Sequence, residues 1–253
     1  MLDNDFIKLQ KKDVDMKELE RVARVGGICG IAGILVYLSV VFLRGINAKT
    51  TEEFLTLAGT GRNGNFIMLE HFLGAGFGIL GIITICALHR LLSSEKSSIA
   101  SSVAVIFGYV GFGIVVTMLI VQGAVMARMS ARFVAASASE QQMVVTLYRG
   151  LRSIDLGLDL AWDVFGCISF LLFGMLMIRS RHFGLIFGLS GIIVAGLLLI
   201  FNVATAPTPP GNAGLIDLGP LAGLWFLAIS IQMLRSAKSV GRYPDLASQA
   251  VKA

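Results

Sequence analysis

The chain has 253 residues, of which 55% are hydrophobic, and a net charge of +5. A soluble domain of this length does not bury so much apolar surface in one core, so the composition predicts an integral membrane protein in contact with lipid. The basic residues flank apolar runs, which is typical of membrane topology signals, and we therefore expect no nucleic acid partner.

The first segment, residues 1–24, is rich in charged residues. Its apolar residues recur at roughly helical spacing: Phe6, Leu9, Met16 and Leu19. This pattern predicts an amphipathic cytoplasmic N-terminal helix on the membrane surface, with an extension of the first span as the alternative. The apolar run that follows is long and ends at Arg44 rather than at a small-residue cleavage site, so we expect no cleavable signal.

Six apolar runs are long enough to cross a hydrocarbon core of roughly 30 Å, which takes about 20 helical residues. They cover residues 25–43, 66–88, 103–127, 156–178, 183–203 and 215–234. Because backbone polar groups are not left unpaired in lipid, each run is predicted to be a helix. The sequence thus predicts an all-α, polytopic six-transmembrane-helix bundle over residues 25–234, followed by a cytoplasmic C-terminal tail, residues 235–253.

The distribution of Lys and Arg predicts the orientation of the bundle. Fourteen of these residues fall in segments on the same side as the N-terminus, and seven fall in segments on the other side. The positive-inside rule then predicts an N-in/C-in topology, which we assign to the bacterial cytoplasmic membrane. The predicted outer loops, 44–65 and 128–155, are long, so any extracytoplasmic recognition is expected to use them.

Glycine is frequent, with 29 residues in the chain. Four GxxxG pairs and a glycine-rich third span contain Gly26 and Gly30, Gly74 and Gly78, Gly184 and Gly188, Gly219 and Gly223, and Gly108, Gly111 and Gly113. Such residues allow helices to approach closely. Two interpretations stay open: the glycines pack the chain's own bundle, or they form an interface with a second copy or another membrane protein.

Polar residues inside spans are informative, because a charge near the bilayer centre costs on the order of 2.5–3.5 kcal/mol. Asp155, Asp159 and Asp163 are spaced i, i+4, i+8 and therefore share one helix face. The candidate ligand- or ion-binding residues are Glu70, His71, Gln122, Asp159, Asp163 and Asn202. All fall in the predicted outer half, which predicts an outward-facing polar cup above a dry inner half. Its deepest groups are expected to be Glu70, His71, Asp159 and Asp163.

These carboxylates have more than one interpretation. Asp155 fits a helix-start residue, and structural ion pairs that tie helices together are expected among Asp155, Arg128, Arg132 and Arg152. A cation or proton site is the functional interpretation. Catalysis is a further alternative, although no motif assigns a catalytic residue.

Other polar and aromatic residues are expected to have structural roles. Asp217 precedes Pro220 and a helical run, which predicts an N-cap. Trp162, Trp225 and Tyr148 are predicted to be interface or packing aromatics rather than a substrate cage.

Cofactor signatures are missing from the sequence. Cys29, Cys86 and Cys167 each lie inside an apolar run without a CxxC motif, so neither a disulfide framework nor a zinc site is expected. The three histidines fall at different depths, which disfavours paired haem ligands. The sequence also contains no P-loop or dinucleotide fingerprint, so it carries no haem, zinc or nucleotide signature, and the cofactor is unknown.

Three stretches resemble a known group of proteins. They are EHFLGAGFGILGIITICALHRLLSS, SSVAVIFGYVGFGIVV and LRSIDLGLDLAWDVFGCISFLLFGMLMIRS. Over residues 66–234 the chain resembles small six-helix bacterial membrane proteins classed as a domain of unknown function, and this resemblance implies a fold but no activity. We expect a non-enzymatic protein, either an accessory or binding subunit or a transporter of small molecules or ions through the cup. The alternative is a membrane-embedded enzyme that uses Asp159, Asp163 and His71.

Overall fold

The computed structural model describes residues 2–43, 48–60, 62–95, 99–211 and 213–240. Within these ranges the chain forms seven α-helices and no strand. They are α1 (Leu2–Leu43), α2 (Thr51–Gly59), α3 (Arg62–Glu95), α4 (Ile99–Ala135), α5 (Ala138–Met177), α6 (Gly184–Thr205) and α7 (Gly219–Val240). All except α2 are long and apolar enough to cross a membrane, by length and composition, which confirms the all-α fold with six candidate spans.

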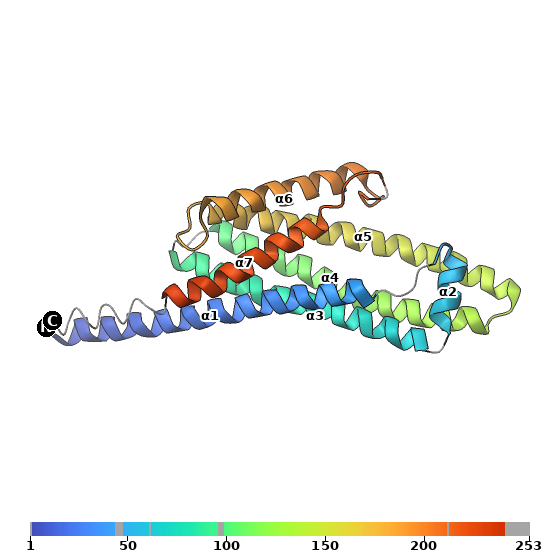
Figure 1. Cartoon of the computed structure of the whole chain (residues 1–253), viewed down its shortest axis with the longest axis horizontal. Coiled ribbons are helices and arrows are strands. Elements are labelled where there is room, and N and C mark those ends of the chain that lie inside the picture. The colour runs from blue at the N-terminus through green and yellow to red at the C-terminus, as the bar shows by residue number, and fades with distance from the viewer. Residues whose placement is uncertain (1, 44–47, 61, 96–98, 212, 241–253) are drawn as a thin grey trace.

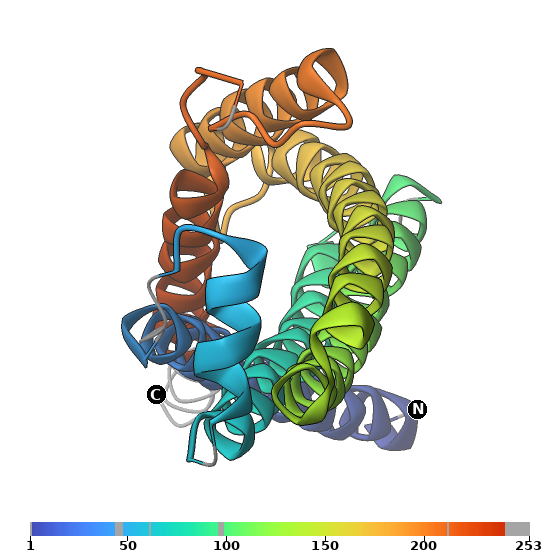
Figure 2. The same cartoon turned by 90° about the vertical axis from the view of Figure 1, so that its right-hand side faces the viewer.

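The six long helices follow one another around a ring (Figures 1 and 2). Each packs on its neighbour in the chain, and α7 closes the ring by packing along α1. α1 begins and α7 ends at one end of the molecule, whereas α2 and the α4–α5 connection lie at the other (Figure 1). We call the second end the hairpin end.

The α4–α5 hairpin extends well beyond α6. The end of α6 lies beside α5: Asn202 and Ala206 line the same small void as Leu156 and Asp159 of α5. Residues 138–155 therefore continue about 27 Å past α6 at the helical rise. Most of the predicted outer loop 128–155 is thus helical, and the hairpin makes its turn at Ser137.

Local interactions explain why the hairpin remains helical. The backbone N–H and the hydroxyl of Ser137 donate to Glu140 Oε2 at 2.9 and 2.7 Å, which is the capping-box arrangement at the start of α5. α2 packs across the hairpin and completes a second small core with α4 and α5. Its buried residues are Leu55, Met129, Phe133, Val144 and Val145. An ion pair of 3.2 Å joins Glu52 of α2 to Arg149 of α5.

Residues 2–24 continue without a break into the first span, as the first part of α1. Leu19 already packs against the main core. The side chains of Phe6 and Leu9 lie outside the described residues, as does the tail from 241 to 253, so the amphipathic character of the segment stays a prediction. The N-in/C-in orientation likewise stays a prediction.

Glycines bring helices together at the end opposite the hairpin. A Cβ added at Gly30 of α1 would collide with the Ser230 side chain of α7, and one at Gly27 would lie 2.7 Å from the Ser230 carbonyl oxygen. Gly188 of α6 meets Gly174 of α5 in the same way, with 2.7 Å to the carbonyl oxygen. These glycines pack the chain's own bundle, and an interface with a second copy stays a prediction.

The short α5–α6 connection is fastened to α3 and α7. The Glu95 carboxylate accepts hydrogen bonds from Ser180 Oγ at 3.1 Å and from the Arg181 backbone N–H at 3.3 Å. Gln232 Nε2 donates to the His182 carbonyl oxygen at 2.6 Å. The buried His182 ring places Nε2 3.3 Å from Glu95 Oε1. The connection therefore ties three helices together at this end of the bundle.

We expect Gly30→Leu to destabilise the protein by about 1–3 kcal/mol, because the added side chain has no room between α1 and α7. Gly76→Leu is the matched control, since a Cβ at Gly76 meets nothing within 4 Å. Thermal unfolding in detergent should show a lower Tm for Gly30→Leu, and an unchanged or higher Tm for Gly76→Leu because leucine favours a helix. Equal Tm values for the two variants would contradict this packing.

We also expect His182 to make stability depend on pH. Burial lowers the pKa of His182 from its ordinary value, while the Glu95 carboxylate opposes that shift and Arg181 adds to it. The folded chain then binds this proton less readily than the unfolded chain, so stability is lost as the pH falls below about 6.5. His182→Gln should therefore lose less Tm than the unmodified protein between about pH 7 and pH 5. Parallel losses would show that His182 does not contribute.

Candidate functional site

A cavity of about 410 Å³ lies inside the ring, toward the hairpin end. Its volume falls within the range of roughly 300–1,000 Å³ that small-molecule pockets occupy. Its walls come from α1, α3, α4, α5, α6 and α7, and from Asp217 in the α6–α7 connection. Along α5 the lining residues Arg152, Asp155, Asp159 and Asp163 lie nearer the hairpin end and Phe170 lies farther along the helix; we call the polar part of the cavity the rim and the part lined by aromatic rings the floor.

Carboxylates dominate the polar part of the cavity. Asp155, Asp159 and Asp163 line it from one face of α5, at the spacing that the sequence predicted. The Asn202 side chain hydrogen-bonds Asp163, and the charges of Asp159 and Asp217 act on the same carboxyl group. The carboxylates reach one space from α5 and the α6–α7 connection, whereas Asn202 of α6 lines the small neighbouring void. The cavity therefore combines elements that are distant in the sequence.

Asp217 has two contacts that explain its position. Its Oδ1 accepts a hydrogen bond from the Gly219 backbone N–H at 2.8 Å, at the start of α7. Asp217 thus lies one residue before the cap position, which Leu218 occupies, and bonds the first residue of α7 rather than acting as the predicted N-cap. The same side chain also lines the cavity, so one residue fixes the beginning of α7 and adds a carboxylate to the site.

One guanidinium lines the described part of the cavity, that of Arg152. Its Nη1 lies 3.8 Å from Asp155 Oδ2, and Gln122 of α4 hydrogen-bonds the same carboxyl group. Arg128 and Arg132 lie on exposed positions of α4. The positive charge of Arg152 is thus directed to Asp155 at the rim, and the carboxylates outnumber it.

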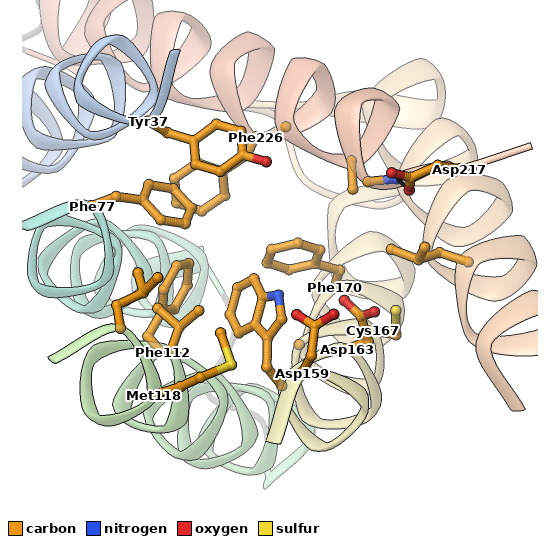
Figure 3. Close-up of a pocket in the computed structure, with 18 of the residues that line it drawn as sticks. Tyr37, Phe77, Phe112, Met118, Asp159, Asp163, Cys167, Phe170, Asp217 and Phe226 are labelled. Carbon is orange, nitrogen blue, oxygen red and sulfur yellow. Dashed lines mark hydrogen bonds between the residues drawn. The ribbon is translucent and has the colours of Figure 1, made fainter. Parts of the chain in front are cut away.

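Tilted and edge-on aromatic rings form the floor of the cavity (Figure 3). Phe112 is the central ring, with its centroid 5.0 Å from Trp162 and 5.8 Å from Phe226. Phe170 lies 5.9 Å from Phe226, and Phe77 lies 5.6 Å from Phe112. These rings come from α3, α4, α5 and α7, so the floor joins opposite sides of the bundle.

Glu70 and His71 are buried but are not among the residues that line the cavity. His71 Nδ1 lies 2.8 Å from the Ile67 carbonyl oxygen, and since a carbonyl only accepts, Nδ1 carries the proton. The His71 ring lies against α4, where a Cβ added at Gly123 would be 2.8 Å from the His71 Cβ. The structure therefore places this pair between helices and places Asp159, Asp163 and Gln122 in the cavity.

The aromatic floor is the part of the site that sequence reasoning missed. Tyr37, Phe77, Phe112, Phe170 and Phe226 all line the cavity. Each lies in an apolar run, where a ring that faces lipid and a ring that faces a cavity have the same sequence context. Only the neighbouring Trp162, which is adjacent to Asp163, carried a local signal that an aromatic side chain belongs beside the carboxylates.

Metal-binding geometry is missing from the described residues. Within them, no group of three or more His, Cys, Asp or Glu side chains is arranged to hold a metal ion. His89 Nδ1 instead lies 2.8 Å from Ser101 Oγ, and His182 lies beside Glu95. The three cysteines are free thiols, and Cys167 lies at the cavity wall.

A family model described as "Domain of unknown function (DUF4386)" matches residues 25–235. The matched range contains the second part of α1, from residue 25 on, and all residues that line the cavity. No curated protein and no solved structure matches the chain.

Proposed function

Because the chain belongs to the family described as domain of unknown function DUF4386, whose description gives no activity, we propose a function from its geometry. The protein binds a small molecule in the cavity inside the ring, and this cavity opens to the outside of a bacterial cytoplasmic membrane. The observation that carries the proposal is a cavity of about 410 Å³ that combines a carboxylate-rich rim with an aromatic floor. Ligand sites typically combine mostly apolar walls with a few converging polar groups.

The outward direction rests on the distribution of charge. Lys and Arg residues concentrate in the first part of α1, in the last turns of α7 and at the α5–α6 connection, at the end of the molecule away from the hairpin end. Positive residues are retained on the cytoplasmic side, so the hairpin end faces outward. A ligand then reaches the cavity from outside the cell.

Binding is favoured over transport by the packing beneath the floor. A molecule that crossed the bundle would have to pass the rings of Phe112, Phe170 and Phe226. Below them, α1 meets α7 at Gly27 and Gly30 with no space for a Cβ. Passage therefore requires a rearrangement of helices, whereas binding requires none. If the helices did rearrange in this way, the same site would also permit transport.

The enzymatic alternative is less well supported. It requires Asp159, Asp163 and His71 to face one substrate, and His71 is not among the residues that line the cavity. Its Nδ1 proton is already directed to the Ile67 carbonyl oxygen.

An accessory role has one specific observation in its favour. Met143, Leu147 and Ile154 are 67%, 52% and 61% exposed on one face of α5, in the part that extends past α6. Lipid does not cover apolar side chains that project beyond the membrane, so such a face fits a protein partner. This role is compatible with a ligand in the cavity.

The orientation is testable with single cysteines in a background where the three native cysteines are replaced. Ser139→Cys lies at the tip of the hairpin, and Lys238→Cys lies near the end of α7; both positions are exposed. In intact cells, a membrane-impermeant maleimide should modify Ser139→Cys, whereas Lys238→Cys should react only after permeabilisation. The reverse pattern would overturn the outward-facing cavity.

Occupancy is testable by blocking the cavity. Gly223 lines it, and a Cβ added there has as its nearest neighbour Ile34 Cδ1 at 3.9 Å, so Gly223→Leu extends into free space. Native mass spectrometry of gently extracted protein should show a bound small molecule that Gly223→Leu loses. Gly113→Leu is the matched control, because a Cβ at Gly113 meets nothing within 4 Å and the residue does not line the cavity. A molecule retained equally by both variants, or absent from all, would contradict binding in this cavity.

A further inference from the structure

We infer that the ligand of this cavity is an organic cation, with an amine or quaternary nitrogen beside the carboxylates and a compact apolar or aromatic body on the rings. This inference rests on the proposed binding function and adds the chemical class of the ligand. Two independent features of the cavity carry it: more carboxylates than basic side chains along its wall, and aromatic rings that line the same space.

The charge comes from carboxylates that converge from two parts of the chain. Asp159 and Asp163 project from α5, and Asp217 lies on the other side of the same space (Figure 3). Their charges act on one another, as the effects of Asp159 and Asp217 on Asp163 show. Like charges in a space of low dielectric repel strongly, and a bound cation relieves that repulsion.

The positive charge already present in the described wall lies elsewhere. Arg152 is directed to Asp155 at the rim, 3.8 Å away. Asp163 instead has the neutral Asn202 amide as its hydrogen-bond partner. Asp163 lies one helical turn deeper than Asp159 and two turns deeper than Asp155. The deeper part of the cavity therefore favours a positive ligand and disfavours an anion.

The aromatic floor selects the kind of cation. Phe170 lines the same cavity as Asp159 and Asp163, about two helical turns past Asp163 on α5, and Phe112 and Phe226 continue the ring surface (Figure 3). Cations are attracted to ring faces, and organic cations also bury their apolar bodies there. A small inorganic ion would leave these rings without contacts. In addition, no described cluster of His, Cys, Asp and Glu has the arrangement that a metal ion needs.

Three probes of one size test the charge preference directly. 1-Methylnicotinamide is a cation, nicotinamide is neutral and nicotinate is an anion, yet all share the same substituted pyridine ring. Binding is measured as quenching of Trp162 fluorescence in the full chain with Trp225→Phe, since Trp162 lines the cavity. Because Trp225 donates a hydrogen bond to Phe187, the shift in Tm that each probe causes in the unmodified chain provides a second readout.

We expect 1-methylnicotinamide to bind roughly tenfold more tightly than nicotinamide, and nicotinate to bind more weakly than both. Asp163→Asn should reduce the preference for the cation to below roughly threefold, because it removes charge but keeps the side-chain shape. Glu140→Gln is the control, since Glu140 caps α5 at the hairpin and does not line the cavity. It should leave the preference unchanged.

The outcomes separate the ligand class from the binding function. Equal affinity for the three probes, or tighter binding of nicotinate, would overturn the cation class, and so would a preference that Asp163→Asn leaves intact. If Gly223→Leu still removes a co-purified molecule in those cases, the binding function stands. Failure of all three probes to bind, with a co-purified molecule that carries no positive charge, would also overturn the cation class.

Discussion

A carboxylate within a membrane helix is stable only where water, a hydrogen bond or an opposite charge reaches it. The arrangement of this molecule follows from that constraint on α5. Asp155, Asp159 and Asp163 share one face of the helix, and the ring turns that face away from lipid and toward a cavity. Asn202 of α6 and Gln122 of α4 then supply neutral hydrogen bonds to two of the three carboxyl groups. The other five helices of the ring are arranged around the space that α5 requires.

Glycine has opposite consequences in the two halves of the bundle. At the end opposite the hairpin, Gly27, Gly30, Gly174 and Gly188 let backbones touch, so that half is filled. Around the cavity, Gly166 and Gly223 contribute wall without filling the space. The ring of helices is therefore closely packed at one end and encloses a cavity toward the other. This asymmetry, more than any single residue, is why a binding function fits the structure.

The sequence predicted much of the fold, because apolar length and the i, i+4, i+8 spacing of the aspartates are local signals. The family resemblance, stated over residues 66–234, is confirmed by a match over 25–235. Two features were beyond local reasoning. The hairpin stays helical past the end of α6 because α2 packs on it, which depends on contacts such as Phe54 with Tyr148. Glu70 was expected in the cup but does not line the cavity, because its position along the span did not reveal which helix face it occupies.

Cysteine accessibility along α5 tests this cavity most directly. Single cysteines at Asp155, Asp159 and Asp163, on the cavity face, should react with a small water-soluble thiol reagent, and reactivity should end at Phe170 in the floor. Cysteines at Ile154 and Gly157, on the opposite face, provide the comparison, and reactivity at Gly157 should stay low where lipid covers it. Reaction with a period of three to four residues that stops at the floor is the predicted result. Uniform protection of the cavity face, or reaction that continues past Phe170 toward Met177, would contradict the account.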